Sequence, residues 1–489
     1  MVPADEKPVD QRRHKPHSPV MYLRLLHASL LTLAAVLLPD AGAAARPVVI
    51  GYYHLDTADI NQYRSGRVAF PVSRITPEQA RMLTHINFSF IALDQQGRCS
   101  FPEGSDSAQA AGVLQALRQL KRFNSGLRIL FSVGGWSATN DDSPGVARYR
   151  QAAATATARR QTVASCIALM QKHGLDGIDI DWEYPRADDA DNFVALLQEF
   201  RQQLDQLTPD ATRRRYQLTI AAAGGAFNMA RTYTSLPAIA AQVDYINLMT
   251  YDLNGPWEKK TGHNAHLFGD PAEALFDNPL RAVQRAPAEK TEIMATSFPS
   301  PFALTVDAAV QQYLQAGVPP GKLVLGVPFY GRAYFDVATE QHGLHQPFNT
   351  PAGDDYHGEV QLLPGCTSCL RLQDPRLPAY ADIRNMRAAD MGYERYFSED
   401  SKVPWLYHPQ RHIFVSYEDA ESLRYKVAYL RHYRLAGVMF WHLGQDDSQA
   451  TLLRTLHQAL HQPPLPADKL FSGHGLRYLP RPVAGRQNP

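Results

Sequence analysis

The sequence predicts an α/β protein: a closed (β/α)8 TIM barrel with a small α+β insertion domain between its seventh and eighth strands. Eight short, nearly continuous apolar runs are typical of buried parallel strands, and helical patterns separate most of them. A long interval of different character lies between the last two runs, and it predicts the insertion.

The candidate strands share β-branched and aromatic residues in runs bounded by turn signals. In chain order they are residues 48–53, 85–93, 128–134, 177–183, 217–223, 245–251, 323–330 and 437–443. Helical patterns cover residues 162–172, 193–207 and 306–316, and Gly174 and Gly317 suit two of their C-terminal ends. An open doubly wound sheet is the alternative fold, but no G-x-G-x-x-G motif follows the first strand.

These patterns predict four regions. Residues 46–334 and 416–462 are expected to form the barrel, and residues 335–415 the insertion, in which residues 393–397, 403–407 and 413–417 are expected as antiparallel strands. Residues 463–489 are rich in Pro and Gly and predict an extended, locally packed tail. Residues 1–45 predict a signal peptide region.

The N-terminal region has the order of a secretory signal, with either Met1 or Met21 as its start. A basic segment precedes the apolar run 23–38, and the small-residue stretch 41–45 follows. The run is short for a membrane span, which disfavours the alternative of a membrane anchor. We therefore expect a secreted protein, extracellular or periplasmic, with no stable membrane association after cleavage.

The charge balance argues against polyanionic partners. A formal net charge of +1 gives no reason to expect nucleic acid or an anionic membrane surface as partner. A neutral polymer fits this balance, and we expect a monomer.

The four cysteines predict one local disulfide. Cys366 and Cys369 form a C-x-x-C, and neither a second C-x-x-C nor a nearby His pair completes a zinc site. In an exported chain this spacing favours a small loop staple between Cys366 and Cys369. Cys99 and Cys166 are expected to be free thiols, with Cys166 buried in an apolar helical pattern.

The strongest chemical signal is the run D-G-I-D-I-D-W-E at residues 176–183. Alternate residues of a strand face one side, so Asp179, Asp181 and Glu183 should all point into the barrel. Three ionised carboxyls in such a place are costly, so at least one should hold a proton near neutral pH, as a general acid requires. An acidic, solvated edge strand is the alternative, and the apolar residues between the acids argue against it.

This run resembles the D-x-x-D-x-D-x-E signature of family 18 glycoside hydrolases. Residues 132–136 (S-V-G-G-W), 249–252 (M-T-Y-D) and 437–445 (G-V-M-F-W-H-L-G-Q) resemble three further motifs of that family, in the same order. The resemblance covers roughly residues 47–460. It implies a chitinase that hydrolyses β-1,4-linked N-acetylglucosamine polymers, with chitin and chito-oligosaccharides as its binding partners.

The resemblance also implies a mechanism in which the substrate assists. Glu183 would protonate the glycosidic oxygen while the substrate's N-acetyl carbonyl attacks the anomeric carbon to form an oxazolinium ion. Asp181 would hold the acetamide N–H, Tyr251 its oxygen, and Asp179 would share a proton with Asp181. No cofactor and no metal are expected. The insertion would form one wall of the cleft, and with the resemblance this predicts chitobiose release from chain ends.

Further residues are assigned to substrate binding or to support of the acids by their motif positions. Sugar rings stack on aromatic faces, so tryptophans at strand ends are candidate subsites. The assigned residues are Tyr52, Ser132, Trp136, Tyr184, Met249, Asp252, Trp257, Tyr330, Arg332 and Trp441. Trp182 and Trp405 are assigned to core packing.

Two other functions stay open, a chitin-binding lectin and an endo-β-N-acetylglucosaminidase. The family's lectins typically lose the catalytic acid, whereas Glu183 is present here. The insertion and the motif around Trp257 favour chitin over a protein-linked glycan. The tail carries no chitin-binding module of the kind found in bacterial members, so strong binding to crystalline chitin is not expected.

Overall fold

The chain divides into two units, Met1–Arg46 and Pro47–Pro489. The computed structural model describes residues 46–55, 70–208, 215–225, 235–270, 304–349, 377–387 and 391–472. The expected signal region, residues 1–45, lies outside these ranges. Within them, no helix is both long and apolar enough to cross a membrane.

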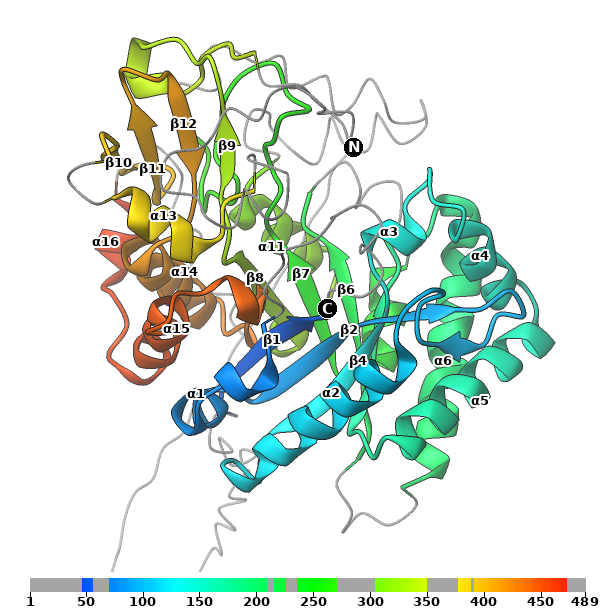
Figure 1. Cartoon of the computed structure of the whole chain (residues 1–489). Coiled ribbons are helices and arrows are strands. Elements are labelled where there is room, and N and C mark those ends of the chain that lie inside the picture. Colours follow the sequence, from blue (N-terminus) through cyan, green and yellow to red (C-terminus); the bar gives the residue numbers. More distant parts are fainter. Residues whose placement is uncertain are drawn as a thin grey trace, which may run out of the picture. The chain divides into compact units, whose positions relative to one another are not determined.

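Parallel strands of the second unit form the predicted closed barrel (Figure 1). They are β1 (Val48–His54), β2 (His85–Leu93), β4 (Arg128–Gly134), β5 (Gly177–Asp181), β6 (Gln217–Ala223), β7 (Tyr245–Met249), β8 (Leu323–Pro328) and β13 (Gly437–Trp441). The barrel closes because β1 pairs in parallel with both β13 and β2. The short strand β3 (Cys99–Ser100) is antiparallel to the end of β2.

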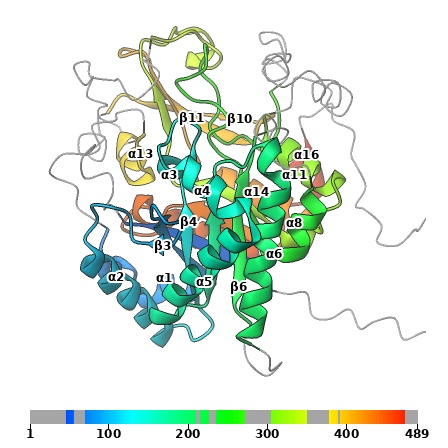
Figure 2. The same ribbon diagram turned by 90° about the vertical axis from the view of Figure 1, so that its right-hand side faces the viewer.

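Most of the described helices surround the barrel and connect its strands, whereas one lies in the insertion and the last two follow the final barrel strand (Figures 1 and 2). The helices are α1 (Pro77–Met82), α2 (Ser107–Gln119), α3 (Trp136–Thr139), α4 (Val146–Ala154), α5 (Ala156–Lys172), α6 (Ala190–Gln206), α8 (Leu236–Gln242), α11 (Val306–Gln315), α13 (Tyr380–Met386), α14 (Ala420–His432), α15 (Thr451–His461) and α16 (Ala467–Phe471). Helix α5 begins earlier than expected because the Thr155 side chain accepts a hydrogen bond from the Ala158 N–H and caps it.

Side-chain alternation separates two apolar regions. On β1, Val49 and Tyr53 join the large core between strands and helices, whereas Val48, Ile50 and Tyr52 pack inside the barrel. The period of two residues in a strand explains this division. The same rule decides which side chains of β5 enter the barrel.

The insertion is built on a second, antiparallel sheet in the order β10-β11-β12-β9. Its strands are β9 (Arg332–Tyr334), β10 (Glu394–Ser398), β11 (Val403–His408) and β12 (Ile413–Ser416). Three of them match expected strands. The fourth, β9, lies within a range assigned to the barrel, yet it pairs with β12.

The small sheet stands at the end of the barrel where the parallel strands finish, above them in Figure 2. Its strand β9 follows almost directly after β8. The segment that leaves β7 meets the same sheet: the Asn264 N–H donates to Ser416 Oγ at 2.8 Å, and the Tyr334 hydroxyl donates to Asn254 Oδ1 at 2.6 Å. These contacts place the insertion on the rim formed by the C-terminal ends of the barrel strands, where barrel enzymes carry their active sites.

The tail is described only as far as residue 472. Within that part, α16 forms where an extended chain was expected, and Leu470 is buried. The Phe471 ring contacts Phe268 and His432 at centroid distances of 5.8 and 5.0 Å. An apolar surface therefore orders the start of the tail.

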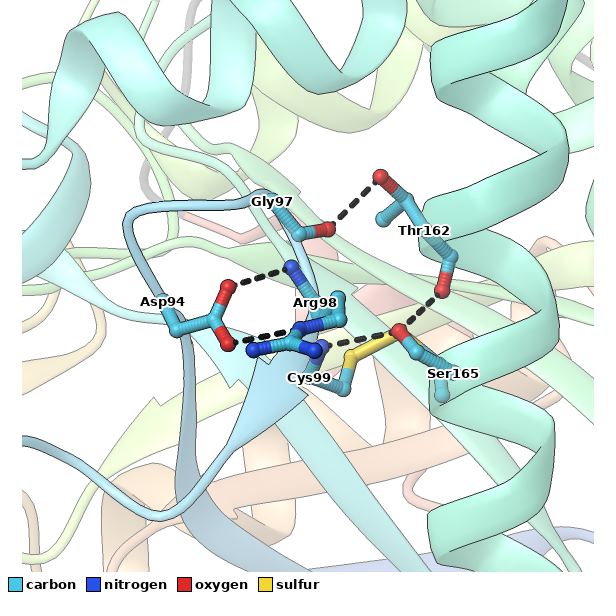
Figure 3. The surroundings of a disulfide bond; sticks show 7 residues. Asp94, Gly97, Arg98, Cys99, Thr162 and Ser165 are labelled. Atoms are coloured by element: carbon cyan, nitrogen blue, oxygen red, sulfur yellow. Dashed lines mark hydrogen bonds and ion pairs between the residues drawn. A yellow bond between two sulfur atoms is a disulfide. The ribbon is translucent and has the colours of Figure 1, made fainter.

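The expectation that Cys99 and Cys166 are free thiols is wrong, because these two residues form a disulfide (Figure 3). Their Cα atoms lie 4.9 Å apart although 67 positions separate them in sequence. Strand β3 runs alongside α5, and the Cys99 N–H donates to Ser165 Oγ at 2.9 Å. The same helix donates from the Thr162 hydroxyl to the Gly97 carbonyl at 2.7 Å. Cys166 is buried, as its helical pattern predicted.

The predicted pair Cys366–Cys369 lies outside the described residues, so that disulfide remains a prediction.

Candidate active site

Three carboxyl groups lie on or just after β5. Ile178, Ile180 and Trp182 belong to the core between strands and helices, so the alternate residues Asp179 and Asp181 face the barrel interior. Glu183 follows the strand by two residues, at the rim. Asp179 and Asp181 are buried, and Glu183 is partly exposed.

Asp179 is surrounded by hydrogen-bond donors from four other strands of the barrel, β1, β4, β6 and β7. Its Oδ2 accepts from the Tyr52 hydroxyl at 2.9 Å and from Ser132 Oγ at 2.7 Å. Its Oδ1 accepts from Thr219 Oγ1 at 2.5 Å and from Asn247 Nδ2 at 3.2 Å. Burial raises the pKa of Asp179, and the four donors act against that rise because they stabilise the charged form.

Asp181 has a different environment. Its Oδ1 is buried and has no hydrogen-bond partner among the residues that the structure describes. Burial, the charge of Glu183 and the charge of Asp179 raise the pKa of Asp181 well above its usual range. An unpaired buried oxygen between two acids is suited to accept a donor from a bound molecule.

Glu183 has the properties of a general acid. Burial raises the pKa of Glu183 to about 8, and the nearby charge of Asp252 adds to the rise. Its backbone N–H donates to Thr139 Oγ1 at 2.9 Å, which fixes the chain at the end of β5. A carboxyl that keeps its proton near neutral pH can give it to a leaving group.

Tyr251 lies just beyond β7, and its ring packs edge-on against Tyr330 at a centroid distance of 6.2 Å. Its hydroxyl approaches Met439 Sδ at 3.9 Å inside the barrel. Burial together with the charges of Asp181 and Glu183 raises the pKa of Tyr251 well above its usual range. The phenol therefore stays protonated and available as a donor. Met249 packs in the same interior cluster.

A polar cluster joins the segment after β7 to the insertion. Asp252 Oδ1 accepts from the Tyr330 hydroxyl at 2.8 Å and from Arg332 Nε at 2.9 Å. The Arg332 guanidinium lies over the Trp257 ring, 4.9 Å from its centroid, in cation–π geometry. Four residues predicted from sequence for the binding site therefore meet at this rim.

Trp441 ends β13 within a group of aromatic rings. Its ring stacks on Phe90 with centroids 5.6 Å apart and an interplanar angle of 17°. Tyr52 and His54 flank it at 5.7 and 5.3 Å. This cluster makes Trp441 a supported aromatic surface next to the acids, because Tyr52 also donates to Asp179.

The remaining predicted residues lie at the same end of the barrel or pack beneath it. Trp136 opens α3 directly after β4, and its side chain is 60% exposed, while that of Trp257 is 51% exposed. Tyr184 follows Glu183 and is buried. Trp182 and Trp405 are buried, in agreement with their assignment to packing. In the described ranges no group of three or more His, Cys, Asp or Glu is arranged to hold a metal ion.

Known proteins are similar in sequence to this chain over most of its length. Residues 48–446 match glycosyl hydrolases family 18. The chain belongs to that family. It is 46% identical to chitinase B of Serratia marcescens over 441 residues, which cover 89% of this chain and 88% of that protein. It is 30% identical to chitotriosidase-1 of Mus musculus, over 82% of this chain and 76% of that protein.

Solved structures agree with the family assignment. The Group IV chitinase of Ostrinia furnacalis in complex with allosamidin has a TM-score of 0.66 and 27% identity, covering 85% of this chain and 99% of that one. A family 18 N-acetylglucosaminidase of Paenibacillus barengoltzii has a TM-score of 0.62 and 29% identity, covering 84% and 99%. The family 18 membership makes this chain a glycoside hydrolase.

Sequence reasoning missed several residues of the site. Thr219 and Asn247 are polar residues in the middle of largely apolar strands, and the period of two residues puts them on the inward side. Phe90 and His54 support Trp441 from β2 and β1. The available signal was a buried-strand pattern interrupted by one polar residue, which indicates a partner inside the barrel.

Proposed function

We propose that this family 18 enzyme is a chitinase that hydrolyses β-1,4-linked N-acetylglucosamine polymers with retention of configuration. The proposal rests on the carboxyls on and just after β5: buried Asp181 has an Oδ1 that is unpaired among the described residues, and Glu183 follows two residues later at the rim, where burial raises its pKa to about 8. The 46% identity to a protein named chitinase B supports chitin as the substrate.

In the proposed first step, Glu183 transfers its proton to the glycosidic oxygen as the bond between that oxygen and the anomeric carbon breaks. The carbonyl oxygen of the substrate's own N-acetyl group forms the new bond to this carbon and gives an oxazolinium ion. Asp181 accepts a hydrogen bond from the acetamide N–H, for which its unpaired Oδ1 is available. The Tyr251 hydroxyl donates to the acetamide oxygen.

In the second step, the Glu183 carboxylate takes a proton from water, and the water oxygen attacks the anomeric carbon. The carbon–oxygen bond of the ring opens, the acetamide is restored, and Glu183 is protonated again. Asp179 shares a proton with Asp181 during this cycle and thereby adjusts the negative charge that faces the oxazolinium ion.

The aromatic residues position the polymer. Trp441 forms the surface beneath the sugar that reacts, and exposed Trp136 and Trp257 contact the leaving-group side. Because the small sheet stands on the catalytic rim, we propose that it walls the cleft and favours release of chitobiose from chain ends. The enzyme acts as a monomer in this proposal.

We also propose that the protein is secreted. The disulfide between Cys99 and Cys166 supports this location, since such bonds persist in oxidising compartments and are rare in the cytosol.

A time course of products from N-acetylglucosamine hexamers tests the proposed activity. The expected early products are the disaccharide and the tetrasaccharide, and a mixture of all lengths would contradict chain-end action. Glu183→Gln should lose nearly all turnover, by at least about 10²–10⁴-fold, while still binding the hexamer. Glu199→Gln on α6 is the matched control and should keep full activity, because its bond to Gln203 lies away from the site. Cleavage of a protein-linked glycan in place of the hexamer would favour the endo-β-N-acetylglucosaminidase.

A further inference from the structure

We propose that Thr219 and Asn247 are positioning residues that keep the Asp179–Asp181 pair singly ionised. This inference rests on the proposed function, in which the pair must present one negative charge to a cationic intermediate. Both residues are buried inside the barrel, and both donate to the same oxygen of Asp179.

Four hydrogen-bond donors surround the carboxyl group of Asp179. A carboxylate offers about four lone-pair positions to hydrogen bonds. Tyr52 and Ser132 fill the two positions on Oδ2, while Thr219 and Asn247 fill the two on Oδ1. A proton on Asp179 would displace one of these donors, so in the observed arrangement Asp179 is ionised and the one proton of the pair lies on Asp181.

The Asn247 amide is oriented with its NH₂ group toward both Asp179 and Tyr52. Its Nδ2 lies 3.2 Å from Asp179 Oδ1 and 3.3 Å from the Tyr52 oxygen. An amide NH₂ can only donate, so it leaves the Tyr52 hydrogen directed at Asp179 Oδ2. Asn247 thereby supports two of the four bonds that Asp179 accepts.

The Asn247 amide is also incompletely hydrogen-bonded. Its Oδ1 is buried and has no hydrogen-bond partner among the described residues. A buried, unpaired amide oxygen is unfavourable and calls for an explanation. The two donations from Nδ2 to the site supply that explanation, because a side chain retained only for packing would be apolar.

The surroundings show why donors are required. Asp179 meets Tyr52, Ser132, Thr219 and Asn247 from β1, β4, β6 and β7, and it shares β5 with Asp181, beyond which Glu183 follows. These neighbours are neutral or acidic, and burial alone opposes ionisation of both aspartates. Without the donors, the pair would hold two protons at mildly acidic pH and could not stabilise a positive charge.

The test is the pH dependence of kcat/KM for a chito-oligosaccharide. Thr219→Val and Asn247→Leu each remove one donor with little change in shape. The acid-side pKa of the profile should move up by about one unit in either variant, because a hydrogen bond to a charged group is lost. Thr219→Ser keeps a hydroxyl and should restore the wild-type acid limb.

Thr162→Val is the matched control, because Thr162 is a buried threonine whose hydroxyl bonds the Gly97 carbonyl outside the barrel. Its profile should coincide with that of the wild type. A rate that falls equally at every pH in Thr219→Val and Asn247→Leu would overturn the inference and leave these residues a purely structural role.

A readout independent of activity separates this inference from the proposed function. Infrared titration of the protonated-carboxyl band should detect one carboxyl with a raised pKa in Thr219→Val relative to wild type, whatever the substrate. An unchanged titration refutes the inference alone. Full activity of Glu183→Gln refutes the proposed function alone.

Discussion

Removal of the Cys99–Cys166 disulfide should lower the stability of the protein by an amount that the length of the closed loop determines. The bond closes a loop over a sequence separation of 67. For a loop of that length, the lost chain entropy of the unfolded state corresponds to about 4 kcal/mol at 25 °C. Cys99→Ala/Cys166→Ala should therefore lower the free energy of unfolding by up to this amount.

The corresponding change in melting temperature is small because the unit is large. An unfolding entropy of about 2 cal/mol/K per residue over the second unit converts this loss into a fall of about 5 °C. Thermal unfolding followed by circular dichroism at one fixed scan rate measures it. The rate of catalysis at 25 °C should be unchanged, since the bond joins β3 to α5 (Figure 3) and Cys166 packs in the core between strands and helices, whereas the aspartates face the barrel interior.

Thr162→Val provides the control for this measurement, because it breaks one hydrogen bond at the same junction. A net hydrogen bond contributes about 1 kcal/mol, so the expected fall is about 1 °C. Equal melting temperatures for the double cysteine variant and the wild type would refute the reasoning.

Three further predictions follow from the pKa values and the remaining cysteines. Because the general acid must be protonated, kcat/KM should fall as pH rises through about 8. Asp252→Asn should move this alkaline limb of the profile to lower pH, because it removes a charge that raises the pKa of Glu183. An alkaline limb at the wild-type pH would contradict this effect of Asp252 on Glu183. Burial lowers the pKa of His266 from 6.5 to about 4. Between these pH values the unfolded chain binds a proton at His266 that the folded chain does not bind. The free energy of unfolding should therefore decrease by about 3 kcal/mol as pH falls through this range. Denaturant unfolding at pH 7 and pH 4 should show a smaller loss in His266→Asn than in wild type, and an equal loss would exclude His266 as the cause. Thiol counting on unfolded, unreduced protein should find no reactive thiol, whereas two would exclude the predicted bond between Cys366 and Cys369.

Local sequence patterns predicted the parts of this protein that depend on local periodicity. The barrel strands follow from short apolar runs, and the meeting of Asp179, Asp181 and Glu183 follows from the two-residue repeat of one strand. The rim residues Asp252 and Arg332 were placed by motif, and the structure joins them by a hydrogen bond.

The parts that were missed depend on contacts between distant segments. Cys166 reads locally as a buried helical residue, which is correct, but its partner lies on a two-residue strand that has no sequence signal of its own. Strand β9 is three residues long and forms only because β12 returns beside it. Thr219 and Asn247 reach Asp179 only because the closed barrel brings their side chains on β6 and β7 next to it, and no local sequence pattern identifies Asp179 as their partner.

In the proposed mechanism the substrate's N-acetyl group acts as the nucleophile while Glu183 supplies the proton. The most direct measurement is the anomeric configuration of the first product, followed by NMR during hydrolysis of fully acetylated and fully deacetylated oligomers. We expect the β-anomer to appear first from the acetylated substrate and the deacetylated substrate to remain uncut, since a free amine cannot form the oxazolinium ring. Initial formation of the α-anomer, or rapid cleavage of the deacetylated oligomer, would contradict this mechanism.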